Sequence, residues 1–268
     1  MRTRKTGGED IPALKRLWQE AFADLQQDID AFFETIYPES IGFCAEEDGE
    51  ILSMLFALPQ TIVKGEKQLK SMYLYAVATK KERRGQGLCR ALMAYAEKEL
   101  RKRYVQALLL SPASEALAGF YAKLGFTRQT GAHRIILPCG EVKGQAAEIG
   151  VQDYAGLRET ALWDISHVRY GKAQLEYAVS DGTFYCLMAG YNMGCAAAKT
   201  GTDGKKAFIY EMLPGKETLP ALAEKLGTGE YEVLDAQDSA SGETWCMLKW
   251  LDTPYPEFEP VYMGFSLA

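Results

Sequence analysis

The sequence has few of the residues that metal sites, disulfide frameworks and membrane spans require. It holds two histidines and six scattered cysteines, and no two cysteines have the C-x-x-C spacing. We therefore expect neither a metal site nor a disulfide framework. No segment approaches eighteen consecutive apolar residues, and no apolar signal core follows the basic first residues, Met1 to Gly8. These absences argue against a membrane helix and a secretion signal, and they predict a cytoplasmic protein.

An excess of positive charge is also absent. The formal net charge is −6, and hydrophobic residues make up 47% of the 268 residues. A chain with this charge is a poor ligand for nucleic acid or for an anionic membrane, so neither partner is expected. The apolar content is ordinary for a globular protein and is sufficient for two modest cores. The negative charge favours a cationic acceptor, such as an amine.

Two common nucleotide motifs are missing, although one segment has the character of an anion site. The chain contains neither G-x-x-x-x-G-K-[ST] nor G-x-G-x-x-G. The apolar run from Met72 to Ala78 predicts a strand, and the apolar spacing from Leu88 to Leu100 predicts a helix, with Gly85 and Gly87 in the turn between them. Unpaired N–H groups at a helix start attract anions, and glycine lets a phosphate approach the backbone. This segment predicts a site for a nucleotide-like ligand.

A second segment follows with a related order of elements. The continuous apolar run from Val105 to Leu110 predicts another strand. Beyond Ser111 and Pro112, the sequence predicts a helix that ends in Phe120-Tyr121-Ala122-Lys123-Leu124-Gly125-Phe126. Gly125 suits the position just after the end of a helix, where a left-handed backbone is common.

Together the two segments resemble the GNAT N-acetyltransferase superfamily. Arg84 to Cys89 is similar to its R/Q-x-x-G-x-G/A signature, and the second segment is similar to its closing motif, N-x-x-A-x-x-F/L-Y-x-K-x-G-F. Cys89 stands where glycine or alanine is usual, Ser114 where asparagine is usual, and Leu117 where alanine is usual. The whole chain resembles bacterial two-part acetyltransferases and, more distantly, the enhanced-intracellular-survival acetyltransferases.

The resemblance implies an α+β fold with a mixed α/β sheet. It places a GNAT acyl-CoA N-acyltransferase fold in residues 1–138, a linker in 139–150 and a smaller C-terminal domain in 151–268. A degenerate GNAT-like repeat and an unrelated α+β domain both fit the C-terminal part. The sequence predicts helices at Asp10–Phe22, Leu25–Tyr37 and Leu219–Leu226, hairpins at Ile41–Leu58 and Thr183–Lys199, and strands at Gln60–Val63 and Ala207–Leu213.

The same resemblance implies acetyl-CoA as the co-substrate. Backbone groups of Val77, Ala78 and Thr79 are expected to pair with its pantetheine arm, and a main-chain N–H near Val77 is expected to polarise the thioester carbonyl. The turn that begins at Arg84 is expected to hold the diphosphate. The residues that the resemblance assigns to acetyl-CoA are Val77, Ala78, Thr79, Arg84, Gly85, Gln86, Gly87, Leu88, Cys89, Ser114 and Tyr121.

Tyr121 is also the expected general acid, and the general base has two candidates. A phenol with a pKa near 10 can protonate a thiolate with a pKa near 8.5 at a cost of about 2 kcal/mol. The segment from Ser71 to Ala76 has no carboxylate, so Tyr73 or Tyr75 relaying through water is one option for the base. The other is the carboxylate of Ala268, because the chain ends in an apolar segment that we expect to dock, and the tail carboxylate serves as base in the survival-type relatives.

The resulting prediction is an N-acetyltransferase that moves an acetyl group from acetyl-CoA to a primary amine in a direct ternary complex. The acceptor stays open between a small amine, an antibiotic amine, an amino acid and a peptide or protein amine, and a homodimer is compatible with the sequence. Because the base is missing from its usual strand, a non-catalytic acyl-CoA-binding or scaffolding module is the alternative. A longer-chain acyltransferase is a third option, which requires a roomy apolar pocket.

Overall fold

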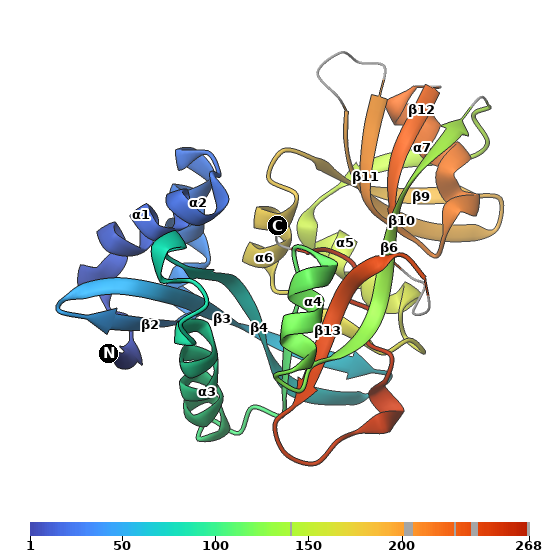
Figure 1. Ribbon diagram of the computed structural model, residues 1–268. Coiled ribbons are helices and arrows are strands. Elements are labelled where there is room, and N and C mark those ends of the chain that lie inside the picture. Colours follow the sequence, from blue (N-terminus) through green and yellow to red (C-terminus); the bar gives the residue numbers. More distant parts are fainter. Residues whose placement is uncertain (140, 201–205, 228, 237–240, 267–268) are drawn as a thin grey trace.

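The structure is a computed structural model that describes residues 1–139, 141–200, 206–227, 229–236 and 241–266 (Figure 1). No helix in these ranges is long and apolar enough to cross a membrane. The helices of four or more residues are α1 (Ile11–Phe22), α2 (Gln26–Thr35), α3 (Leu88–Arg101), α4 (Glu115–Ala122), α5 (Val151–Ala161), α6 (Lys172–Ala178) and α7 (Leu219–Leu226).

The strands form one continuous sheet. Its order is β1-β2-β3-β4-β5-β13-β6-β12-β11-β10-β9-β7, and β8 pairs with β3 beside this path. The strands are β1 (Arg2–Lys5), β2 (Ile41–Glu47), β3 (Glu50–Lys64), β4 (Lys67–Thr79), β5 (Ala107–Leu110), β6 (Thr127–Cys139), β7 (Gln145–Ile149), β8 (His167–Arg169), β9 (Thr183–Ala189), β10 (Asn192–Thr200), β11 (Lys206–Leu213), β12 (Gly229–Asp235) and β13 (Glu243–Trp250).

Most predicted elements form close to their predicted ends. The helices α1, α3 and α7 and the hairpin of β9 and β10 confirm the sequence patterns. The separate strand predicted from Gln60 to Val63 is wrong. These residues continue β3, because the β3–β4 pairing runs without a break from Phe56 to Lys64, opposite Tyr75 to Lys67.

The two halves of the chain share one pairing order. In the N-terminal half, β1 to β4 are successive antiparallel neighbours and β5 is parallel to β4. In the C-terminal half, β7, β9, β10 and β11 are successive antiparallel neighbours and β12 is parallel to β11. Of the two alternatives for the C-terminal half, this order favours the degenerate GNAT-like repeat.

The two halves exchange their sixth strands. β13 comes from the end of the chain, yet it pairs with all four residues of β5 in the N-terminal half, from Ala107 to Leu110. β6 pairs with β13 through residues 127–132 and then with β12 through residues 133–139. The domain boundary at residue 138 stays a prediction, and β7 lies within the segment expected to be a linker. The sheet of the N-terminal half therefore contains residues from both halves.

Alternation along β3 builds a core on each face of the N-terminal sheet. Met54 and Phe56 pack in the cluster that includes Leu14 and Trp18 of α1, whereas Leu55 packs in the cluster of α3. Successive side chains of a strand point to opposite faces, so α1 and α2 cover one face while α3 covers the other (Figure 1). This layering leaves the ends of β4 and β5 between the two layers.

We expect Leu248→Ala to destabilise the protein by about 2–5 kcal/mol, because it opens a cavity at the strand exchange. Leu248 of β13 is fully buried and lies opposite Leu109 of β5 and Thr127 of β6. Urea unfolding monitored by circular dichroism measures the change. The control is Leu25→Ala, whose side chain is 64% exposed and whose loss should cost less than about 0.5 kcal/mol. Equal effects of the two substitutions would contradict the role given to β13.

Candidate functional site

A cleft opens where β4 and β5 separate. The ladder between these strands contains only three pairs and ends at Tyr73 and Leu109. Just beyond it, Ala76 has a φ of +47°, and the β3–β4 register shifts between Met54 and Phe56. A bulge of this kind bends its strand. β4 therefore turns away from β5, and residues 73–77 of β4 line the opening.

This opening is the central cleft, a cavity of about 810 Å³ that both halves of the chain line. Its N-terminal walls include residues of α1, β4 and α4, and its C-terminal walls include residues of α6, β11 and β13. Its aromatic lining residues are Trp18, Phe22, Tyr73, Tyr75, Tyr121, Tyr177, Phe208, Tyr210, Trp245 and Phe265. The volume is in the range of sites that bind small molecules and cofactors.

The glycine turn before α3 (residues 84–87) has the backbone that an anion site requires. Gly85 and Gly87 have φ values of +77° and +81°, and a Cβ at either would meet nothing within 4 Å. The left-handed backbone thus calls for glycine here, and the space in front of it is open. α3 begins directly after Gly87, so the N–H groups of its first turn lie beside this space.

The two arginines beside the turn differ in their contacts. Arg83 forms a 2.7 Å ion pair with Glu47, and its Nε lies 3.0 Å from the side-chain oxygen of Gln86. Arg84 is exposed, and its Nε donates to the carbonyl of Thr79 at 3.1 Å. Arg83 therefore holds the turn to β2, whereas Arg84 lies along the edge that β4 presents to the opening.

Tyr121 lies on the α4 wall of the central cleft. Its side chain is 7% exposed and packs against the rings of Phe120 and Phe126. Burial, followed by the nearby Cys89, raises the pKa of Tyr121 above its ordinary value. The phenol is therefore protonated at neutral pH and can donate a proton or a hydrogen bond.

The other predicted residues of this region lie in β4 and at the start of α3. Val77 lines the central cleft. Ala78 and Thr79 form the end of β4, where their carbonyl and hydroxyl bond to the Ser53 hydroxyl at 2.7 and 2.9 Å. Leu88 and Cys89 begin α3; Leu88 is buried, and burial raises the pKa of the Cys89 thiol to about 11.

Ser114 has a structural contact rather than a place in the cleft. Its hydroxyl accepts a 3.3 Å hydrogen bond from the Leu117 N–H and so caps α4, and Ser114 is not among the lining residues. Ala268 lies outside the described residues. Tyr73 and Tyr75 both line the cleft, and burial raises the pKa of each phenol.

The acidic end of the cleft is a feature that sequence reasoning missed. Asp24 and Asp28 line it at the start of α2, and Asp24 accepts a 2.7 Å hydrogen bond from Trp18. The other charged lining residues pair off: Arg134 lies 2.9 Å from Glu232, and Lys199 lies 2.6 Å from Asp181. Negative charge is therefore in excess at this end. No motif marks these two aspartates, since they lie far in sequence from every other cleft residue except those of α1 and α2.

The C-terminal half also holds α4 in place. Glu115, in the first turn of α4, accepts hydrogen bonds from the Thr244 backbone N–H at 2.5 Å and from its hydroxyl at 3.1 Å. Thr244 belongs to β13, next to Trp245 of the cleft wall. The position of Tyr121 consequently depends on a strand from the end of the chain.

Comparison with known proteins gives a family for the N-terminal half. A family model described as "Acetyltransferase (GNAT) domain" matches residues 2–128. The fold is similar to that of a probable N-acyltransferase from Enterococcus faecalis (TM-score 0.72, 15% identity, covering 93% of this chain and 72% of that one). It is similar also to a GCN5-related N-acetyltransferase from Anabaena variabilis (TM-score 0.73, 15% identity, 94% and 73%). No curated protein matches the sequence.

A third structure bears on the two-part layout. The chain is similar over nearly its whole length to a tandem GNAT protein from the clavulanic acid biosynthesis pathway (TM-score 0.54, 12% identity, covering 95% of this chain and 99% of that one). At these identities the similarity shows the fold alone. The GNAT fold predicted from the two motifs is confirmed.

We expect the stability difference between the wild type and Glu115→Gln to shrink as the pH falls. The hydrogen bonds from the backbone and then the hydroxyl of Thr244 hold the pKa of Glu115 below its ordinary 4.5. The folded state thus binds this proton less readily than the unfolded chain, and the carboxylate stabilises the fold above about pH 4.5. Below that pH the wild-type carboxyl becomes neutral, like the amide of the variant.

Urea unfolding of both proteins between pH 3 and pH 7 measures the difference. This range is chosen because it covers about two pH units on either side of the pKa of glutamate. Glu34→Gln is the control, since Glu34 is exposed on α2 and its side chain has no hydrogen bond or ion pair in the described part of the chain. A difference that does not change with pH would show that the link between α4 and β13 does not depend on charge.

Proposed function

Because residues 2–128 match the GNAT acetyltransferase domain, and this family uses acetyl-CoA, we propose that the chain transfers the acetyl group to a primary amine bound in the central cleft. One observation carries the proposal. A single cleft contains the free edge of β4 and a buried, protonated tyrosine, and it ends in two aspartates. Both substrates can thus meet beside Tyr121 in a direct ternary complex.

The described residues fit acetyl-CoA. The glycine turn offers open space, backbone N–H groups and the Arg84 guanidinium to a diphosphate. The edge of β4 at residues 77–79 can pair with the amides of the pantetheine arm as an added strand would. When bound, acetyl-CoA supplies a thioester carbonyl, and positioning by these groups accounts for a large share of the rate enhancement.

The residues of the chain then manage the protons of the transfer. The amine nitrogen forms a bond to the thioester carbon, the carbon–sulfur bond breaks, and the sulfur takes a proton from Tyr121. The proton that the nitrogen releases as it becomes the amide restores the phenol. A backbone N–H near Val77 supports the negative charge that develops on the carbonyl oxygen. Because burial raises the pKa of Tyr121, the phenol is a weaker acid than in water, so proton transfer has to accompany the cleavage of the carbon–sulfur bond.

The transfer also needs a base for the amine. A primary amine with a pKa near 10.4 must lose a proton, at a cost of about 4–5 kcal/mol at neutral pH. Tyr73 and Tyr75 are buried and protonated, so either could take part only by relaying a proton through water. The carboxylate of Ala268 stays a prediction, and the docked tail leads toward the cleft that it would have to reach.

The composition of the acceptor end supports a cationic small molecule. Asp24 and Asp28 attract a positive charge, and the rings of Trp18 and Phe22 lie on the same wall. Aromatic faces bind ammonium groups and flat apolar groups. This end therefore suits an amine with an apolar or aromatic body, although amino acids and peptide amines have the same reacting group.

A second candidate rests on what β4 lacks. The segment from Ser71 to Ala76 carries no carboxylate, which favours a non-catalytic acyl-CoA-binding or scaffolding module. Both candidate proteins would bind acetyl-CoA, and only the acetyltransferase would transfer the acetyl group to an amine. A panel of tyramine, spermidine, lysine, kanamycin and a peptide with a free N-terminus, assayed by release of the CoA thiol, separates them.

We expect Arg84→Ala to weaken acetyl-CoA binding about tenfold or more, because hydrogen bonds to a charged group contribute about 1.5–3 kcal/mol. Titration calorimetry with acetyl-CoA and with free CoA measures the affinity. Arg101→Ala is the matched control, since it removes the same charge at the far end of α3, where Arg101 pairs with Asp252. Equal losses in both variants would assign the effect to overall charge, and an unchanged affinity in Arg84→Ala would remove Arg84 from the site.

We expect Tyr121→Phe to lower kcat about 100-fold while leaving the affinity for acetyl-CoA unchanged, because the variant keeps the ring and loses only the proton. Steady-state rates with the best amine of the panel, together with calorimetry, measure both quantities. Tyr104→Phe is the control, as Tyr104 is 86% exposed and lies outside the cleft.

Full activity in Tyr121→Phe would rule out the proposed acid. Binding of acetyl-CoA without turnover of any amine by the wild type would instead favour the scaffolding module. The same assay addresses Ala268: ending the chain at Leu267 moves the terminal carboxylate by one residue, and it should slow turnover without weakening acetyl-CoA binding.

A further inference from the structure

The last described residues, 260–266, form a tail that is neither a strand nor a helix and is buried from Val261 to Phe265. Val261, Tyr262, Met263 and Phe265 are each 6% exposed or less. An isolated β-bridge joins Tyr262 of this segment to His167 of β8. Phe265 and Ser266 line the central cleft.

The backbone of the tail is bonded at successive residues. The Val261 N–H donates to Gln129 at 3.1 Å, and the Tyr262 N–H and carbonyl bond to Ser166 and Val168 at 2.8 and 2.9 Å. The Gly264 carbonyl accepts from the Trp245 indole at 2.8 Å. Irregular backbone can be buried only when its polar groups find partners, and these bonds supply partners at Val261, Tyr262 and Gly264.

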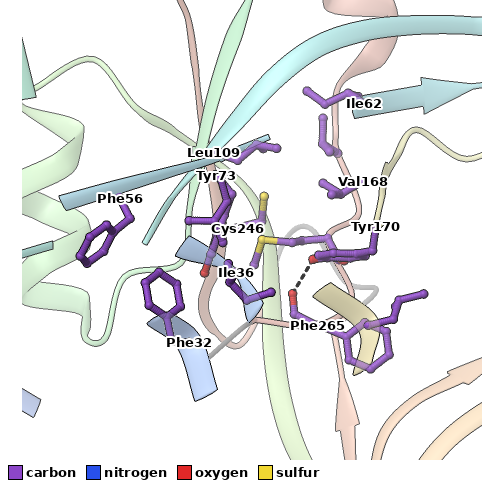
Figure 2. Packing of buried hydrophobic residues seen from close by; sticks show 14 of the residues in the cluster. Phe32, Ile36, Phe56, Ile62, Tyr73, Leu109, Val168, Tyr170, Cys246 and Phe265 are labelled. Carbon is purple, nitrogen blue, oxygen red and sulfur yellow. Dashed lines mark hydrogen bonds between the residues drawn. The ribbon is translucent and has the colours of Figure 1, made fainter. Parts of the chain in front are cut away.

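Tyr170 bonds to the part of the tail that reaches the cleft. Its hydroxyl lies 3.0 Å from the Met263 carbonyl and 2.7 Å from the Phe265 carbonyl, and it donates its one proton to this pair of acceptors. Figure 2 shows the bond to Phe265, with Val168 close to the tyrosine ring. The rings of Tyr170 and Phe265 also pack edge to face, with centroids 5.8 Å apart.

A buried ion pair lies under the same residues. Arg158 and Glu211 are each 1% exposed and lie 2.8 Å apart. The guanidinium also donates to the carbonyls of Val168 at 2.7 Å and Met263 at 3.3 Å, while Glu211 accepts from the hydroxyl of Tyr262 at 2.9 Å and from that of Tyr154. Each charge is therefore surrounded by partners, which a buried ion pair requires.

Gly264 allows the tail to lie against this pair. Its φ is +73°, and a Cβ there would sit 2.1 Å from the Glu211 carboxylate and 3.0 Å from the Arg158 guanidinium. A larger residue would meet both backbone strain and a collision with two buried charges. The position needs glycine on two independent grounds.

We propose that Tyr170, with the Arg158–Glu211 pair, is a positioning residue that fixes the tail so that Phe265 and Ser266 complete the acceptor wall of the central cleft. The bonds to Gln129, Ser166 and Val168 already anchor the tail at its start. The bond from Tyr170 to the Phe265 carbonyl lies beyond that anchored start. It fixes the position of the residues that face the cleft. The inference rests on the proposed function, since it assigns this wall to the amine acceptor.

Tyr170→Phe tests the proposal because it removes the hydroxyl and keeps the ring. We expect KM for the best amine of the panel to rise about tenfold, with kcat changed less than KM and the affinity for acetyl-CoA unchanged. Gly264→Ala disturbs the same contact from the tail side and should act in the same direction. Tyr231→Phe is the control: it also removes a buried hydroxyl bonded to a backbone carbonyl, that of Gly227, but Tyr231 does not line the cleft.

Digestion with carboxypeptidase, followed by mass spectrometry, measures how firmly the tail is bound to the rest of the protein. This measurement does not require acetyl transfer. Release of Phe265 should be about tenfold faster in Tyr170→Phe than in the wild type or in Tyr231→Phe. Release as slow as in the wild type, in both Tyr170→Phe and Gly264→Ala, would overturn the proposal, as would faster release with an unchanged KM. Faster release in a protein whose wild type turns over no amine would leave the tail contact standing and overturn the proposed acceptor wall together with the transferase function.

Discussion

The cleft depends on the exchange of β6 and β13 between the two halves. β5 pairs with β4 through only three residues, and without another neighbour it would be a short, weakly held edge. β13 pairs with every residue of β5, so β4 can bend away without loss of the strand beside it. The separation that admits a substrate in the N-terminal half is thus stabilised by a strand from the end of the chain.

The same exchange is linked to the features of the N-terminal half that the C-terminal half shares and those that it lacks. It retains the pairing order of the N-terminal strands, but only the seven residues 236–242 separate β12 from β13, where the sixteen residues 111–126 separate β5 from β6. There is no room for a counterpart of α4 or for a second Tyr121. Its turn before α7, from Pro214 to Thr218, also lacks the two glycines of the first. What the C-terminal half contributes instead is β13, the tail and one wall of the cleft.

Sequence reasoning succeeded where a function uses neighbouring residues and failed where it uses distant ones. A diphosphate cradle is a continuous turn, so the turn at Gly85 and Gly87 was predictable, and its backbone has the expected form. Asp28 and Tyr210 meet in one cleft only because the strand exchange brings α2 and β11 together, which no local pattern encodes. Ser114 has a contact that its motif does not predict, since its hydroxyl caps α4, and the ligand contact that the motif predicts stays a prediction.

The Arg158–Glu211 pair is better explained by the directional hydrogen bonds that it makes to the tail than by a contribution to the stability of the fold. Burying two charges costs several kcal/mol in desolvation, and apolar side chains of similar volume often stabilise a core equally well. Apolar side chains, however, could not bond the Met263 carbonyl or the Tyr262 hydroxyl, and the tail beyond its anchored start would lose these directional partners. Directional bonds from a fully paired guanidinium and carboxylate select one register. The tail has no strand neighbour over most of its length to set that register, so the ion pair and Tyr170 take over the task that a sheet performs elsewhere in the fold.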